Sequence, residues 1–152
     1  MSIFLIRHAS AGRRQPHTKD IDRPLDERGF EQANRIAETL DGIALQLILT
    51  SPALRCHQTV EPLAKVHGVD IERNPHLSEG QSAAGALALA NRLAAAEVDA
   101  ALCSHGDILP ALLDTLAGDG VPLDGAGCAK GSIWTLEIQD GRISRGHYTP
   151  AP

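Results

Sequence analysis

Two histidines of this sequence stand just beyond short apolar runs of the kind that form buried strands. His8 follows the run Ile3–Ile6, and His105 follows Val98–Cys103, with one polar residue in between in each case. In open parallel sheets, binding sites lie just beyond the carboxyl ends of the strands. If both strands are parallel and central in one sheet, the two imidazoles emerge at the same edge.

Two arginines belong to the same predicted edge. Arg7 directly precedes the first histidine, and Arg55 lies near the start of the helix expected after the apolar run Leu45–Leu49. We expect this helix to begin at Pro52 with Ser51 as its N-cap. Its first turn would point unpaired backbone N–H groups at an anion. Two guanidiniums, two imidazoles and a helix N-terminus together predict a pocket for phosphate, although each residue alone could be structural.

The elements that must position these side chains alternate between strands and helices. We expect strands at residues 3–6, 45–49, 69–73, 98–103, 133–138 and 142–147, and helices at 27–40, 52–66, 82–96 and 110–116. Continuous apolar strands are typical of a parallel sheet that is covered on both faces. The pattern predicts a three-layer, doubly wound α/β fold with a mostly parallel sheet, helices on both faces and an antiparallel C-terminal edge hairpin turning at Asp140-Gly141.

Length and composition limit the kinds of function. The chain has 152 residues, which favours a single domain over residues 1–152. Fourteen basic against nineteen acidic residues give a net charge of −5, which argues against non-specific binding to nucleic acid or to an anionic membrane surface. Aromatic residues make up only 3%, so no stacking platform for single-stranded nucleic acid is expected.

The cysteines and the apolar segments favour a cytoplasmic protein. Cys56, Cys103 and Cys128 are odd in number and widely spaced, which suits a reducing compartment better than a disulfide framework. The first residues have no positive segment ahead of their apolar run and do not resemble a signal peptide. No apolar stretch approaches the roughly 20 residues that cross a bilayer.

Five short motifs stand in order along the chain. They are Leu5-Ile6-Arg7-His8-Ala9, Arg23-Pro24-Leu25 with Gly29 and Gln32-Ala33, Ser51-Pro52-Ala53-Leu54-Arg55 with Gln58-Thr59, Leu77-Ser78-Glu79, and Ser104-His105-Gly106. Together they resemble the motifs of the histidine phosphatase (phosphoglycerate mutase-like) superfamily. The small size and the RPL stretch look most like the bacterial phosphohistidine phosphatases of the SixA type. One departure is Ala9 where the family's RHG motif has glycine, the smallest change possible.

This resemblance implies a role for each matched residue. His8 would be the nucleophile, and Glu79 would be the proton donor. Arg7, Arg55 and His105 would bind the phosphoryl group. The reaction would need no metal and no other cofactor.

A nucleophilic imidazole must be unprotonated at the working pH. The ordinary histidine pKa is about 6.5, and neighbouring arginines should lower the pKa of His8 further. A hydrogen bond from Nδ1–H to a backbone carbonyl would leave Nε2 free to attack. The arginines would stabilise charge on the equatorial oxygens of a loose transition state, and His105 could donate one more hydrogen bond. Asp107 is a second candidate for the acid, although it could also serve as a helix N-terminal charge.

The segment between the first histidine and the first helix is rich in basic residues. We expect Arg23, in the matched RPL stretch, to reach the phosphoryl pocket. Arg13, Arg14 and Lys19 are expected to be solvated loop residues.

Three readings of the substrate and activity remain open. The domain lacks long insertions, so its pocket should be open. An open pocket favours hydrolysis of a phosphohistidine carried by a protein, and it argues against a mutase reaction. Residues Leu102–Asp107 and the segment from Lys130 to Pro150 also resemble histidine phosphatase domains that some actinobacterial proteins fuse to a Nudix hydrolase. That kinship would favour a small phosphorylated metabolite, such as a nucleotide or sugar phosphate. The third alternative is a catalytically silent phosphate-binding module.

Overall fold

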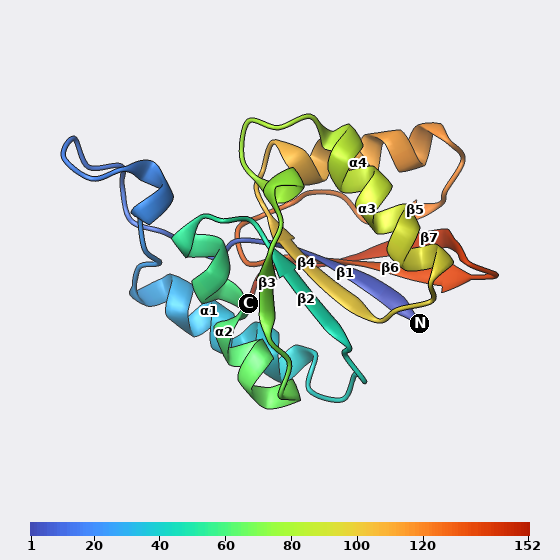
Figure 1. Cartoon of the computed structure of the whole chain (residues 1–152), viewed down its shortest axis with the longest axis horizontal. Coiled ribbons are helices and arrows are strands. Elements are labelled where there is room, and N and C mark those ends of the chain that lie inside the picture. The colour runs from blue at the N-terminus through green and yellow to red at the C-terminus, as the bar shows by residue number, and fades with distance from the viewer.

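A seven-stranded sheet runs through the computed structural model, which describes residues 1–152 (Figure 1). The strands are β1 (Ser2–Arg7), β2 (Leu47–Thr50), β3 (Ile71–Arg73), β4 (Ala100–Ser104), β5 (Leu123–Asp124), β6 (Ile133–Gln139) and β7 (Arg142–Thr149). Their order across the sheet is β3-β2-β4-β1-β6-β7-β5. The first four pair in parallel, whereas β6 is antiparallel to both β1 and β7. The predicted mostly parallel sheet with an antiparallel hairpin is therefore confirmed.

Four helices cover the two faces of this sheet. They are α1 (Glu27–Thr39), α2 (Leu54–His67), α3 (Ala83–Ala95) and α4 (Ile108–Gly118), with short 3-10 turns η1 (Asp20–Asp22) and η2 (Pro75–Leu77). Figure 1 shows α1 and α2 on one side of the sheet and α3 and α4 on the other. No helix is long and apolar enough to cross a membrane.

Alternate side chains of the central strands feed two separate cores. Ile3 and Leu5 of β1 pack with the apolar residues of α3 and α4, whereas Phe4 and Ile6 pack with those of α1 and α2. All four side chains are at most 3% exposed. Successive strand residues point to opposite faces, so a continuous apolar run is what a sheet buried on both faces requires.

The start of α2 differs from the sequence prediction. The helix begins at Leu54 with Ala53 as its N-cap in extended conformation, so Pro52 is not its first residue and Ser51 is not its cap. The Ser51 hydroxyl accepts from the Ala53 N–H at 3.2 Å and also contacts His105. The Ser51 side chain therefore contacts a candidate site residue and does not cap the helix.

Other boundaries differ by a few residues. Helix α4 begins two residues before Pro110, which therefore lies in its first turn, where a missing N–H costs nothing. The two-residue strand β5 pairs with β7 beyond the hairpin and has no signal of its own in the sequence.

The segment between β1 and α1 rises beyond the carboxyl edge of the sheet (Figure 1). It contains η1 and one isolated bridge between Ala11 and Leu25. Its far end is fixed where the Asp26 side chain caps α1 by accepting from the Gly29 N–H. This segment therefore stands over the strand ends from which the candidate site is built.

Candidate active site

The two predicted histidines lie together at the carboxyl edge of the sheet. Strands β1 and β4 are parallel neighbours, and Arg7 is in register with Ser104. The residues that follow, His8 and His105, have ring centroids 5.4 Å apart in an edge-to-face arrangement. The expected meeting of the two imidazoles is confirmed by the pairing of their strands.

His8 is held in one orientation and is almost fully buried. Its Nδ1 donates a hydrogen bond to the Ala9 carbonyl at 2.9 Å, and no protein group hydrogen-bonds to Nε2. Burial lowers the pKa of His8 to about 3; the bond to Ala9 opposes this shift, and the electrostatic interactions with His105, Arg55 and Arg7 add to it. The ring is therefore neutral at physiological pH, with its lone pair on Nε2.

The residue after this histidine does not need to be glycine. Ala9 is fully buried and is not among the residues with positive φ. Its N–H donates to the Thr59 hydroxyl at 2.9 Å. An alanine therefore fits the ordinary backbone conformation of this loop.

Arg7 is packed against the second histidine motif. Its Nη1 donates to the Cys128 carbonyl at 2.8 Å. A Cβ at Gly106 would lie 2.7 Å from both Cζ and Nη2 of Arg7. A side chain at this position would therefore displace the guanidinium of Arg7 from where it lies.

Arg55 is the most deeply buried cation of the site, with a side chain only 2% exposed. Its Nη2 lies 3.0 Å from Oε2 of Glu79 and 3.3 Å from Oδ2 of Asp20. Its Nη1 donates to the Asp20 carbonyl at 2.9 Å. A buried guanidinium is thus paired with two carboxylates, each carried by a different loop.

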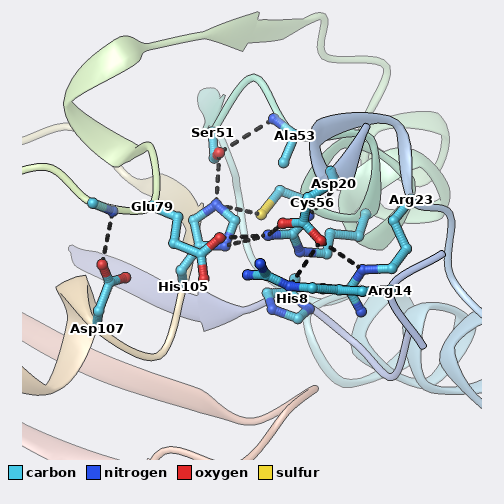
Figure 2. A network of polar contacts seen from close by, with 12 residues as sticks. His8, Arg14, Asp20, Arg23, Ser51, Ala53, Cys56, Glu79, His105 and Asp107 are labelled. Carbon is cyan, nitrogen blue, oxygen red and sulfur yellow. Dashed lines mark hydrogen bonds and ion pairs between the residues drawn. The ribbon is translucent and has the colours of Figure 1, made fainter. Parts of the chain in front are cut away.

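Asp20 joins three arginines and was missed in the sequence. Its Oδ1 lies 3.0 Å from Nε of Arg23 and 3.3 Å from Nε of Arg14, while its Oδ2 faces Arg55 (Figure 2). Burial raises the pKa of Asp20, but the hydrogen bond from Arg23 and the charges of the three arginines outweigh it and hold the pKa below its ordinary value. Nothing in the sequence sets this aspartate apart from the other acidic residues of the segment.

The second histidine is positioned by the turn before α2. Nε2 of His105 lies 2.8 Å from Oγ of Ser51 and 3.6 Å from Sγ of Cys56, and Nδ1 lies 3.4 Å from Nη2 of Arg55 (Figure 2). A guanidinium only donates, so a neutral ring accepts at Nδ1 and carries its proton on Nε2, which donates to Ser51. The role of Cys56 as a neighbour of this ring was not foreseen.

Glu79 and Asp107 contribute differently to the same corner. The Glu79 side chain is 47% exposed and contacts Arg55. Asp107 is exposed, and its Oδ2 accepts from the Gly80 N–H at 2.8 Å (Figure 2). Asp107 therefore anchors the loop that carries Glu79, and its carboxylate is already engaged there.

A cavity of about 170 Å³ opens at this corner. Its walls include Ser51, Arg55, Glu79 and His105, with Asp20 and Ile21 from the overlying segment. Neither His8 nor Arg7 lines it. Arg23 also stays outside, because its Nη1 donates to the Gly12 carbonyl at 2.6 Å and its Nε binds Asp20; it lines an adjoining cavity instead.

Known proteins resemble this chain over most of its length. The 8-oxo-(d)GTP phosphatase of Mycolicibacterium smegmatis is 32% identical over 156 aligned residues, which cover 99% of this chain and 48% of that protein. The chain spans only 38% to 52% of the length of three curated relatives that it matches.

Solved structures share the fold. A crystal structure assigned as phosphohistidine phosphatase SixA from Agrobacterium tumefaciens is 26% identical with a TM-score of 0.74, and 90% of each chain is covered. The protein histidine phosphatase SixA in complex with tungstate has the same TM-score of 0.74 at 23% identity, with 99% of this chain and 95% of that chain covered.

The family assignment rests on the sequence as well as on the fold. Residues 3–85, more than half of the chain, match the sequence model of the histidine phosphatase superfamily (branch 1). This region includes the first histidine motif, Arg55 and Glu79, and the structure adds His105 from β4 to the same corner. The chain belongs to the histidine phosphatase superfamily.

Proposed function

We propose that this chain is a phosphatase that works through a phosphohistidine intermediate on His8. In the first step Nε2 attacks phosphorus, an N–P bond forms, and the bond to the leaving group breaks with its electron pair going to that group. In the second step water attacks phosphorus, the N–P bond breaks, and orthophosphate leaves with neutral His8 restored. The observation that carries this proposal is the buried, neutral ring with Nδ1–H tied to Ala9 and Nε2 free of protein partners.

The arginines and the second histidine would bind the phosphoryl oxygens. Arg7 and Arg55 are near enough to His8 for their charges to lower its pKa, and preorganised donors of this kind stabilise charge as it develops in the transition state. A phosphoryl group on Arg55 must displace the carboxylates of Asp20 and Glu79, which are its partners now. His105 would approach the same oxygens with Nδ1, which lies 3.4 Å from Nη2 of Arg55.

Glu79 is our proposed proton donor to the leaving group. Its side chain is half exposed beside Arg55, so it can reach the outer side of a bound phosphoryl group. Asp107 is placed to hold the Glu79 loop through Gly80. We therefore assign the positioning role to Asp107 and the acid role to Glu79.

Two substrate classes are supported by different relatives. The likeness to the SixA structure at 26% identity favours a phosphohistidine on a partner protein. The likeness to the 8-oxo-(d)GTP phosphatase over almost the whole chain favours a nucleotide. In both classes the same residues would carry the phosphoryl transfer.

The test measures orthophosphate released in the presence of EDTA from an aryl phosphate and from a phosphohistidine-carrying protein. We expect release by the wild type and none above background by His8→Ala. His147→Ala is the matched control, because this exposed histidine lies on β7, and its rate should equal the wild type. The ratio of the two wild-type rates chooses between the substrate classes.

Two results would contradict the proposal. Undiminished release by His8→Ala would remove the nucleophile from the mechanism. Orthophosphate binding without release from either substrate would favour a phosphate-binding module.

A further inference from the structure

A second cavity adjoins the candidate site and is rich in arginine. It has a volume of about 240 Å³, and all of the residues that line it belong to the segment between β1 and α1. Its lining includes Arg13, Arg14, Thr18, Asp20, Arg23 and Asp26. Asp20 also lines the first cavity, so the two cavities share this side chain as a common wall.

The acidic residues of this second cavity leave an excess of positive charge. Asp26 is engaged elsewhere, because Oδ1 accepts from the Gly29 N–H and Oδ2 from the Ser10 hydroxyl, both at 2.8 Å. Asp20 divides its carboxylate between this cavity and Arg55 of the first. The positive charges of Arg13, Arg14 and Arg23 are therefore balanced only in part, by the carboxylate of Asp20, which is shared with Arg55.

The arginines differ in how firmly they are held. Arg23 is 15% exposed and is fixed by Asp20 and the Gly12 carbonyl. Arg14 is 70% exposed, and its one ion pair is that with Asp20. Arg13 makes no hydrogen bond or ion pair with the protein. Arg13 is therefore a solvated loop residue, as expected, whereas Arg14 bends back to Asp20.

We propose that this cavity binds a second phosphate group of the substrate, adjacent to the phosphoryl group that is transferred. The inference rests on the proposed function and specifies its substrate class as an organic di- or triphosphate. One carboxylate separates Arg55 from Arg14 and Arg23, so a phosphate joined to the transferred group through one bridging oxygen reaches these two arginines. Guanidinium groups bind phosphate with paired, charge-assisted hydrogen bonds, and a second phosphate would offer them more charge than Asp20 does.

This substrate class also suits the leaving group. When His8 takes the terminal phosphoryl group, the anhydride P–O bond breaks and its electron pair remains on the bridging oxygen of the shortened phosphate. That oxygen would be stabilised by Arg14 and Arg23. A phosphate leaves readily as an anion, so the half-exposed Glu79 would be needed less as an acid.

The experiment compares two anions that the protein cannot turn over. Orthophosphate and methylenediphosphonate are titrated calorimetrically into the wild type, Arg14→Gln and Arg92→Gln. We expect methylenediphosphonate to bind the wild type at least about tenfold more tightly than orthophosphate, and Arg14→Gln to lose most of that preference. Arg92→Gln removes the same charge from an exposed position on α3 and should keep the preference.

Three results would overturn the inference. Equal affinity of the wild type for both anions removes the second subsite. An equal loss of preference in Arg92→Gln and Arg14→Gln reduces the effect to overall charge. The third result concerns a phosphohistidine peptide with acidic flanking residues. If Arg14→Gln weakens binding of this peptide but not of methylenediphosphonate, the cavity belongs to a protein substrate. Because binding is measured without turnover, failure of the His8 mechanism would appear only in the hydrolysis assay and leave these titrations unaffected.

Discussion

Burial is the main cause of the lowered pKa of His8, the proposed nucleophile. Its pKa is about 3 in the fold against an ordinary 6.5. Between these values the unfolded chain binds a proton that the folded chain does not, so folding becomes less favourable as the pH falls below 6.5. The same shift keeps Nε2 unprotonated through the whole physiological range.

A non-titrating residue at this position should flatten the pH dependence of stability. The wild-type free energy of unfolding should fall by up to about 1.4 kcal/mol per pH unit more steeply than that of His8→Asn between pH 6 and pH 4.5. Urea unfolding at several pH values measures both slopes, and the other histidines cancel in the comparison. Parallel slopes would mean that His8 is protonated in the folded state.

Gly106 allows Arg7 to reach its place. A Cβ there would lie 2.7 Å from the guanidinium, so Gly106→Ala should push Arg7 away from the proposed phosphoryl site. We expect kcat/KM for an aryl phosphate to fall by about tenfold or more, the equivalent of one lost charge-assisted hydrogen bond. Gly118→Ala is the control, because a Cβ at that position meets nothing within 4 Å. Unchanged kinetics in Gly106→Ala would show that Arg7 can shift without loss.

At the scale of elements, the turn from β2 into α2 orients the ring of His105. Ser51 does not cap the helix, and its hydroxyl lies 2.8 Å from Nε2 of the ring. The ring presents Nδ1 toward Arg55. The turn before one helix thus orients a candidate site residue that follows the neighbouring strand β4.

Removal of this hydroxyl should slow the proposed reaction. In Ser51→Ala the buried Nε2–H loses its acceptor, which costs about 1–3 kcal/mol or forces the ring to turn. We expect kcat for an aryl phosphate to fall about tenfold, while Ser144→Ala, on β7, leaves it unchanged. A loss of stability with an unchanged kcat would reduce Ser51 to a structural residue.

The segment between β1 and α1 supplies a carboxylate that would compete with a phosphate for Arg55. Asp20 carries its carboxylate to within 3.3 Å of that guanidinium. Replacement of Asp20 by Asn keeps the shape and removes the charge, so orthophosphate should bind about fivefold more tightly, the equivalent of about 1 kcal/mol. Calorimetric titration tests this expectation. Weaker binding would show that Asp20 orients Arg55 more than it competes for it.

At the scale of the whole molecule, the sequence was most informative where local and long-range requirements agree. The run Ile3–Ile6 is apolar because both faces of β1 are covered. Its pattern therefore predicts both a strand and a central place for that strand in the sheet. The meeting of His8 and His105 follows from parallel pairing of two such strands. The same reasoning could not find Asp20, because an aspartate on a loop has no periodicity and its partner Arg55 is 35 residues away.

The covering of the central strands on both faces leads to a prediction for residues 1–152 as a unit. Leu102 of the central strand β4 is fully buried in one of the two cores. If the chain is one domain, as its length predicts, both cores should melt in a single transition, with the same midpoint for the Trp134 fluorescence and the far-ultraviolet circular dichroism. Leu102→Ala should lower the free energy of unfolding by about 2–5 kcal/mol in that one transition.

Since Trp134 and Leu102 share a core, Val60→Ala in the opposite core should shift the same fluorescence midpoint. Two separate transitions, or a Val60 variant that leaves the tryptophan signal unmoved, would mean that the two layers fold independently and that the site between them is held by fewer constraints than its geometry indicates.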